Sequence, residues 1–124
     1  METKKVLIAE DEAMIAAMWR EAFSLHDCEV VLAKNGLDAI EILGNQSFDL
    51  LITDLRMPEK DGYALIKHIE EKRINLPIVV CSGYIEDEAL LNQNASVKLL
   101  LKKPVDIGKE VQNLIQEINP KPNS

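Results

Sequence analysis

The chain has little cysteine, no long apolar run and fewer basic than acidic residues, and each shortage excludes a class of protein. Its two cysteines, Cys28 and Cys81, lack any C-x-x-C spacing, so we interpret them as two buried thiols in a reducing cytosol. No apolar run approaches the ~18 residues of a membrane span. The apolar stretch after Lys4 and Lys5 is soon interrupted by acids, so we expect neither membrane insertion nor a signal peptide.

The charge is biased toward acids, with 14 basic and 21 acidic residues and a formal net charge of -7 at pH 7. This balance argues against direct binding to nucleic acid or to an anionic membrane. It fits an acidic pocket that needs a cation, although most of the charges are expected on solvated surface. With 124 residues, 47% of them hydrophobic, the sequence predicts one soluble globular domain, which we expect in the cytoplasm.

Short apolar runs recur five times and predict strands. They are rich in Val, Ile and Leu with little polar alternation, as expected for strands buried on both faces of a parallel sheet. The runs are residues 6–9, 30–33, 48–53, 78–81 and 97–101.

The stretches between the runs have helical spacing. The clearest is the last, where apolar residues share one face and Asp106 is the expected N-cap. The weakest is 85–94, which predicts a short helix. The expected apolar stripes are Met14, Met18 and Ala22; Leu37, Ile40 and Leu43; Leu65, Ile66 and Ile69; and Ile107, Val111, Leu114, Ile115 and Ile118.

Five βα units in a row predict a doubly wound α/β sandwich with a parallel sheet. We expect this domain to cover residues 1–119. The ending 120–124, with two prolines, cannot continue a helix and is interpreted as a tail or the stub of a linker.

Ligands of such sheets bind beyond the carboxyl ends of the strands, so the residues at those ends carry the functional prediction. Three acids, a hydroxyl and an ammonium group are expected to converge there. Glu10 and Asp11 follow the first strand, Asp54 the third, Ser82 the fourth, and Lys102-Lys103-Pro104 the fifth.

These residue types suit phosphate chemistry with a divalent cation. Asp11 and Asp54 can supply carboxylate ligands to Mg²⁺, and Glu10 can assist directly or through water. Clustered carboxylates raise one another's pKa, whereas a cation and Lys103 reverse this effect. Asp54 would then be ionised and able to attack phosphorus, with Ser82 donating a hydrogen bond to a phosphoryl oxygen.

Structural interpretations stand beside the functional ones. Glu10 and Asp11 could instead cap the first helix, and Ser82 could be a turn residue. We assign other residues to simpler roles: Lys102 to solvated surface, Asp61-Gly62 to a turn and helix start, Trp19 and Phe23 to packing, and His26 and His68 to the surface.

Taken together, the motifs resemble those of a response-regulator receiver domain, the phosphoacceptor module of two-component signalling. The resemblance spans nearly the whole chain in family order and implies a flavodoxin-like (βα)5 three-layer sandwich with strand order 2-1-3-4-5. The matching pieces are residues 6–11, 49–54, 57–62, Ser82-Gly83 and Lys103-Pro104.

The resemblance implies roles for single residues. Asp54 becomes the phosphoacceptor, and Mg²⁺ (or Mn²⁺ in its place) is held by Asp11, Asp54, assisting Glu10 and the backbone carbonyl of Arg56. Ser82 becomes the switch hydroxyl, Lys103 the lysine that pairs with the phosphoryl group, and Pro104 the site of a cis peptide bond.

The sequence departs from the family at Leu100, where receivers commonly carry Tyr or Phe. The usual aromatic switch is therefore absent at that position. Tyr84, the nearest aromatic along the chain, is our candidate for gating the site. Arg56 and Tyr84 flank the acceptor and are candidates for controlling the access of hydrolytic water.

The resulting hypothesis is a phosphorylation-dependent signalling switch, not a classical enzyme, whose partner is a histidine kinase or histidine phosphotransfer protein. One alternative is a degenerate receiver that acts only as a binding module. Another is a haloacid-dehalogenase-type phosphohydrolase, which needs a second aspartate where this chain has Arg56. The downstream target is not encoded visibly, and we expect either a stand-alone receiver or part of a larger regulator.

Overall fold

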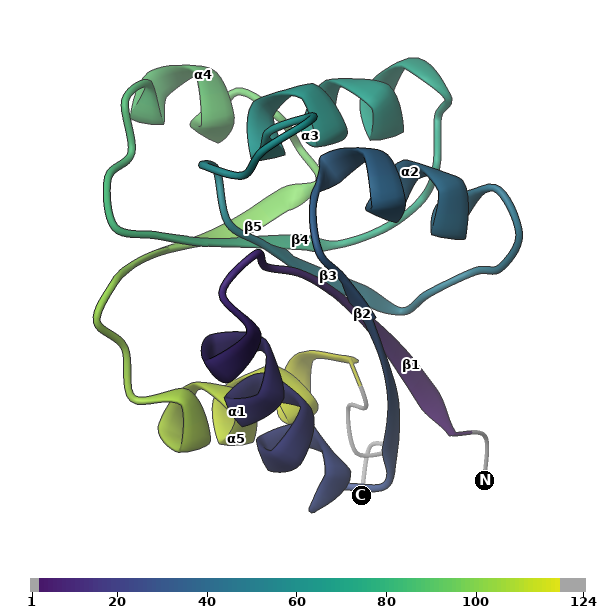
Figure 1. The fold of residues 1–124 in the computed structure, drawn as a ribbon, viewed down its shortest axis with the longest axis vertical. Coiled ribbons are helices and arrows are strands. Elements are labelled where there is room, and N and C mark those ends of the chain that lie inside the picture. The colour runs from purple at the N-terminus through teal and green to yellow at the C-terminus, as the bar shows by residue number, and fades with distance from the viewer. Residues whose placement is uncertain (1–2, 119–124) are drawn as a thin grey trace.

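Five strands and five helices alternate along residues 3–118, the part of the chain that the computed structural model describes (Figure 1). All neighbouring strands are parallel in the order β2-β1-β3-β4-β5, which confirms the predicted doubly wound, flavodoxin-like fold. The predicted tail at 120–124 lies outside the described residues. The elements are β1 (Lys4–Ala9), α1 (Ala13–Ser24), β2 (Cys28–Ala33), α2 (Gly36–Leu43), β3 (Leu50–Thr53), α3 (Gly62–Glu71), β4 (Ile78–Ser82), α4 (Glu88–Asn92), β5 (Val97–Lys102) and α5 (Ile107–Ile118).

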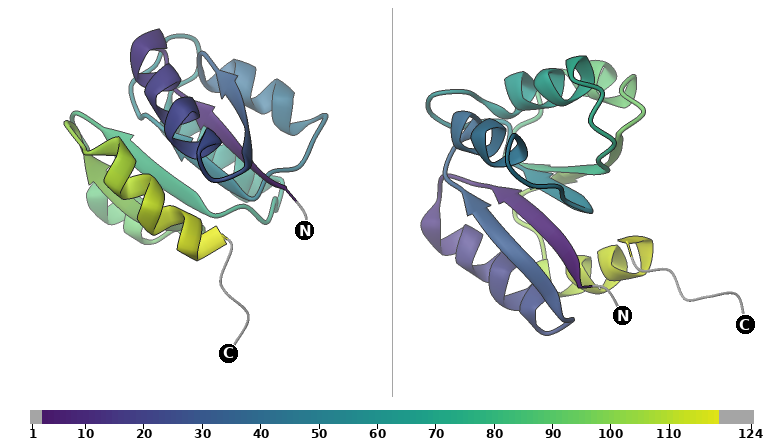
Figure 2. Two further views of the ribbon diagram at one scale, coloured as in Figure 1. Left: turned by 90° about the horizontal axis from the view of Figure 1, so that it is seen from below. Right: turned by 90° about the vertical axis from the view of Figure 1, so that its right-hand side faces the viewer.

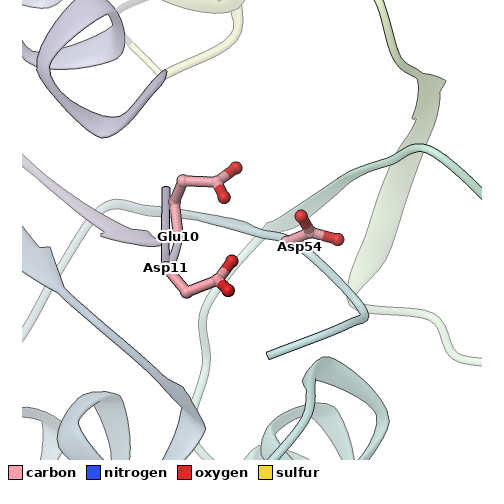
Figure 3. A group of neighbouring side chains, drawn as sticks. All are labelled: Glu10, Asp11 and Asp54. Atoms are coloured by element: carbon pink, nitrogen blue, oxygen red, sulfur yellow. The ribbon is translucent and has the colours of Figure 1, made fainter. Parts of the chain in front are cut away.

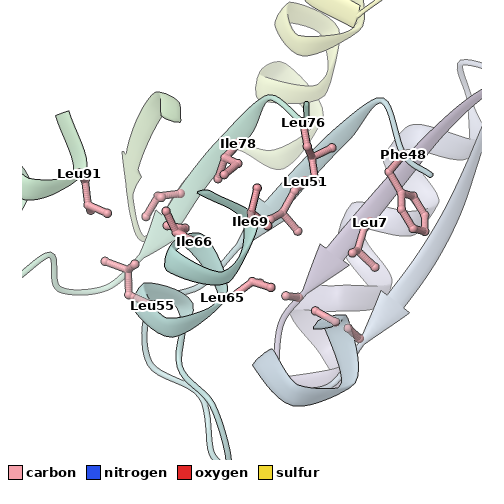
Figure 4. Close-up of a cluster of buried hydrophobic side chains, with 14 residues drawn as sticks. Leu7, Phe48, Leu51, Leu55, Leu65, Ile66, Ile69, Leu76, Ile78 and Leu91 are labelled. Atoms are coloured by element: carbon pink, nitrogen blue, oxygen red, sulfur yellow. The ribbon is translucent and has the colours of Figure 1, made fainter. Parts of the chain in front are cut away.

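The helices form two layers around the sheet. Helices α2, α3 and α4 cover one face, and α1 and α5 cover the other (Figures 1 and 2). Each face has its own apolar core, and the one beneath α2, α3 and α4 includes Leu7, Leu51, Leu65 and Ile78 (Figure 4). The opposite core is built around Trp19 and Phe23 with residues of β1, β3, β4 and α5. The two cores hold the strand ends in a fixed arrangement.

Burial of the strands depends on their place in the sheet. Every residue of β3 and β4 is buried, whereas the edge strands β2 and β5 are largely half-buried or exposed. The prediction of burial on both faces is therefore wrong for the edges, because an edge strand has a neighbour on only one side. The third strand is also shorter than the predicted 48–53. Before it, the Asp49 carboxylate accepts from the Lys5 N–H at 2.8 Å.

Helix α1 presents a different face to the sheet from the one predicted. Met14 and Met18 are 79% and 50% exposed, whereas Ala16, Trp19 and Phe23 are buried. The stacked Trp19 and Phe23 rings, with centroids 6.2 Å apart, bury more apolar surface than the methionines could. The packing role predicted for these two rings is confirmed.

Smaller predictions also needed correction. Leu37 is 39% exposed, and the neighbouring Ala39 is buried in its place. Cys81 is buried as predicted, but Cys28 on the edge strand is only half-buried. His26 is exposed as predicted, whereas His68 is half-buried.

Side-chain caps begin several helices and confirm the predicted boundaries. Asp61 accepts from the Ala64 N–H at 2.9 Å, and Asp106 accepts from the Lys109 N–H at 3.1 Å. Helix α4 is the shortest, with five residues, as the weak pattern at 85–94 predicted. Within residues 3–118, none of the helices has the length and apolar content required to cross a membrane.

Candidate functional site

Three carboxylates meet beyond the ends of β1 and β3. Glu10, Asp11 and Asp54 each offer an oxygen, and these oxygens all lie within 4.8 Å of one another (Figure 3). The register pairs Ala9 with Thr53, and the Asp54 N–H donates to the Ala9 carbonyl at 3.0 Å. Glu10 and Asp54 are buried, whereas Asp11 is exposed. The predicted convergence of the three acids is confirmed, and this oxygen-only set suits a hard divalent cation.

Both oxygens of the Asp54 carboxylate accept hydrogen bonds. Oδ1 accepts from the Leu55 N–H at 2.6 Å, the Arg56 N–H at 3.2 Å and the Ser82 hydroxyl at 2.8 Å. Oδ2 accepts from the Lys103 ammonium at 2.7 Å. These donors replace the water that a buried carboxylate loses, so Asp54 has a fixed orientation with Oδ2 less engaged than Oδ1.

Lys103 joins two of the acids. Its Nζ lies 2.8 Å from Glu10 Oε1 and 2.7 Å from Asp54 Oδ2. Burial alone would lower the pKa of Lys103, but the hydrogen bonds and charges of Asp54 and Glu10 raise it above its ordinary value. The peptide bond between Lys103 and Pro104 is cis, as the resemblance implied. Lys102 is exposed, which agrees with its assignment to the surface.

Glu10 is a buried carboxylate whose ionised form is disfavoured by burial. Burial raises its pKa, and the bonds from Lys103 and from the Glu12 N–H partly offset this rise. The bond from the Glu12 N–H to Glu10 is 3.1 Å long. It is not an N-cap bond, because the N-cap position of α1 is Glu12 itself, and the Glu12 side chain makes no capping bond. The alternative in which Glu10 and Asp11 cap the first helix therefore does not describe their contacts.

A cavity of about 460 Å³ opens beside the acids. On its rim the Arg56 guanidinium lies 5.2 Å from the centre of the Tyr84 ring and 3.6 Å from a Glu86 carboxylate oxygen. Tyr84 is 54% exposed. Leu100 is half-buried and packs against the core beneath α3 rather than lining this cavity. The lining residues are Asp11, Leu55, Arg56, Met57, Pro58, Asp61, Tyr63, Tyr84 and Glu86.

The loop between β3 and α3 is held close to the backbone of two helices. The Gly62 N–H donates to the Leu55 carbonyl, and the Gly36 N–H donates to the Lys60 carbonyl. A Cβ at Gly62 would lie 2.1 Å from the Asp54 carbonyl oxygen, and one at Gly36 would lie 2.2 Å from that of Lys60. Both positions need glycine because backbone approaches backbone there.

One residue near the site was missed in the sequence analysis. Tyr63 lines the cavity from α3, and its hydroxyl accepts from the Asp87 N–H at 3.1 Å. An aromatic side chain directly after the helix-starting Gly62 was the available signal. Cys81 lies on β4, where burial raises its pKa to about 11 despite the nearby Lys103. The sequence analysis predicted that Cys81 is buried but did not place it near Asp54 and Lys103.

The comparisons with known proteins agree with this geometry. Residues 6–116 match the family model of the response regulator receiver domain. Response regulator protein PilR of Pseudomonas aeruginosa is 30% identical over 110 residues, which are 88% of this chain and 25% of PilR. The chain spans about a quarter of the length of the curated relatives it matches.

Solved structures show the same fold. A CheY-like receiver domain protein of Methanospirillum hungatei JF-1 matches with a TM-score of 0.86 and 19% identity, over 95% of each chain. Response regulator protein TrrA of Thermotoga maritima, solved with Mg²⁺ and BeF, has a TM-score of 0.80 and 22% identity, over 94% of this chain and 99% of TrrA. Together with the family match and the acidic cluster at the strand ends, these findings show that the chain belongs to the response regulator receiver domains, which are signalling domains of two-component systems rather than classical enzymes.

Proposed function

We propose that this chain is a phosphorylation-dependent signalling switch that accepts a phosphoryl group on Asp54. The observation that carries the proposal is the arrangement around that carboxylate. It is 6% exposed at the end of β3, with one oxygen held by three donors and the other paired with Lys103. A carboxylate held in a fixed orientation beside an ammonium group is suited to attack on phosphorus.

The proposed reaction transfers a phosphoryl group from a phosphohistidine. An Asp54 oxygen forms the new P–O bond, the P–N bond breaks, and the imidazole nitrogen keeps its electron pair. Oδ2 is the better nucleophile because it accepts one bond, whereas Oδ1 accepts three. Lys103 uses two of its three N–H donors on Glu10 and Asp54, so one donor remains for a phosphoryl oxygen. The Ser82 hydroxyl is placed to donate to another.

We propose that Asp11, Asp54 and Glu10, with the backbone carbonyl of Arg56, hold Mg²⁺, and that Mn²⁺ can replace it. The three carboxylates fit the oxygen preference of either ion, and Arg56 lines the adjacent cavity. The bound ion would neutralise charge on the phosphoryl oxygens. Of the three carboxylates, only that of Asp11 is exposed to solvent.

Access to Asp54 is proposed to depend on Arg56 and Tyr84. The guanidinium lies over the Tyr84 ring, and both line the cavity through which water would reach the acceptor. Their contact would control how easily hydrolytic water reaches Asp54 and so change the lifetime of the phosphoryl group. Leu100, which packs into the core, has no proposed part in this gate.

The proposed partners follow from the chemistry. Receiver domains work with histidine kinases or histidine phosphotransfer proteins, and we propose one of these as the donor. The net charge of -7 supports a protein target downstream rather than nucleic acid or a membrane. Cys28 and Cys81 are free thiols, which supports a cytoplasmic location. We propose residues 1–119 as the receiver unit.

The test is brief treatment with a small phosphodonor and Mg²⁺, followed by intact mass measurement. We expect a labile gain of about 80 Da, one phosphoryl group, in the wild type and none in Asp54→Asn. Asp49→Asn, at the other end of β3, is the matched control and should be modified like the wild type. Absence of any adduct would favour the binding module, and steady turnover of a phosphomonoester would favour the hydrolase.

A further inference from the structure

Tyr63 lies in the first turn of α3, between two hollows of the surface. It lines the cavity beside Asp54 and also a groove of about 540 Å³ between α3 and α4. Its half-buried ring packs against the same apolar core as Ile85 and Leu100. Because the ring is held by packing, the position of its hydroxyl is fixed as well.

The Tyr63 hydroxyl is bonded to the start of the shortest helix. It accepts from the Asp87 N–H at 3.1 Å, and Asp87 is the N-cap of α4, whose carboxylate accepts from the Leu90 N–H at 3.0 Å. A helix of five residues is not stable by itself and depends on contacts made to it. The bond from Tyr63 therefore fixes where α4 begins.

The segment between β4 and α4, residues 83–87, is tied at both ends. At the start of the segment, the Ser82 hydroxyl lies 3.2 Å from the Tyr84 carbonyl oxygen. At the end of the segment, the Asp87 N–H donates to the Tyr63 hydroxyl. The ion pair between Arg56 and Glu86 contributes little, because both side chains are about two-thirds exposed. Within residues 3–118, these two hydrogen bonds are the ones that join this segment to side chains outside it.

The first of these ties competes with the acceptor site. Ser82 has one hydroxyl proton, and its oxygen lies 2.8 Å from Asp54 Oδ1 and 3.2 Å from the Tyr84 carbonyl. A phosphoryl group on Asp54 would add acceptor oxygens near Ser82. If the Ser82 hydroxyl donates to one of them, its hydrogen bond to the Tyr84 carbonyl is lost. The bond to Tyr63 is then the remaining hydrogen bond between the segment and a side chain outside it.

We propose that Tyr63 is a positioning residue whose hydroxyl holds residues 83–87 and the start of α4 against this rearrangement. It thereby sets how tightly the acceptor site holds a phosphoryl group. The inference rests on the proposed phosphorylation of Asp54. Any restraint that favours the starting arrangement weakens binding at the coupled site by the same factor.

The test compares Tyr63→Phe with the wild type in binding beryllium fluoride, a phosphoryl mimic, in the presence of Mg²⁺. The substitution keeps the ring and removes one acceptor. We expect about two- to tenfold tighter binding, the range that corresponds to one neutral hydrogen bond. Ser24→Ala, which removes a hydroxyl bond from the opposite face of the sheet, should bind within about twofold of the wild type.

The hydrogen-exchange rate of the Asp87 amide provides a second test, which needs no ligand. It should be faster in Tyr63→Phe than in the wild type, because the bond to the tyrosine is lost. Equal or weaker binding of the mimic by Tyr63→Phe, while the wild type binds it, overturns the role of Tyr63 and leaves the proposed function standing. A wild type that binds no mimic at all overturns both.

Discussion

Lys103 Nζ lies 2.8 Å from Glu10 Oε1 and 2.7 Å from Asp54 Oδ2, so one ammonium group joins carboxylates from two adjacent strand ends. The Lys103 side chain is 17% exposed, and that of Glu10 only 4%. Buried charges are costly unless they are paired. The charge balance of the site therefore depends on Lys103.

Replacing Lys103 by methionine should destabilise the fold in a pH-dependent way. Near pH 8 we expect a loss of about 2–4 kcal/mol in the free energy of unfolding, somewhat below the cost of breaking a fully buried pair because Lys103 is partly exposed. The loss should be smaller at about pH 5 than near pH 8, because a raised pKa lets Glu10 take up a proton more readily as the pH falls. Urea unfolding at the two pH values measures this difference.

The sign follows from the direction of each pKa shift. Burial raises the pKa of Glu10 above 4.5, and losing Lys103 raises it further. A raised carboxyl pKa gives stability that is present below 4.5 and is lost as pH rises through the folded value. The raised pKa of Lys103 gives stability that is fully present below 10.5 and is lost only above it, so this contribution is constant over the range tested. Lys102→Met should show no such dependence, and an equal loss at both pH values for Lys103→Met would contradict the assignment.

The sequence predicted the fold and the meeting of the site residues because both depend on simple periodicities. Continuous apolar runs indicated parallel strands, and parallel strands bring their carboxyl ends to one edge. The sequence alone therefore predicts that Glu10, Asp54 and Lys103 lie close together. Periodicity does not give the distances between these side chains, and it does not show that Lys103 contacts both acids. Both features depend on strand register and burial.

The errors have a common physical origin in packing. Met14 and Met18 fit a helical stripe as well as Trp19 and Phe23 do, and only competition for the sheet surface decides which face turns inward. Tyr63 was missed for a similar reason. Its neighbour Asp87 is 24 residues away in the chain, so the bond between them belongs to the tertiary structure alone.

Gly62→Ala should disturb both stability and phosphorylation. The added Cβ would lie 2.1 Å from the Asp54 carbonyl oxygen, so the backbone at Asp54 must move. We expect a loss of about 1–3 kcal/mol, even though alanine favours helices over glycine. Thermal unfolding and the rate of phosphodonor labelling measure the two effects.

The matched control for that substitution is Gly83→Ala. A Cβ at Gly83 meets nothing within 4 Å, and the described glycines show no positive φ angle that would strain alanine. Its stability should change by no more than about 0.5 kcal/mol. Similar losses in the two variants would show that the close approach at Gly62 is not the cause.

Mg²⁺ should stabilise the folded chain through the acidic cluster. An ion that binds only the folded state raises the midpoint of urea unfolding, by an amount that grows with its concentration relative to Kd. We expect this rise in the wild type and its loss in Asp11→Asn, which removes one of the three carboxylates. Glu12→Gln changes the same charge one residue later, outside the cluster, and should keep the response. A response retained by Asp11→Asn would exclude Asp11 as a ligand.

The two thiols should differ sharply in reactivity under native conditions. Burial raises the pKa of Cys81 to about 11 from 9.0, so near pH 8 its thiolate fraction falls about a hundredfold. The pKa of Cys28 is raised too, but this residue is only half-buried on the edge strand β2. Iodoacetamide should therefore label Cys28 first, and Cys81 should be labelled at a comparable rate only after unfolding in urea. Mass mapping of the labelled peptides measures both rates, and equal labelling of the folded protein would mean that Cys81 is not enclosed beside the acceptor site.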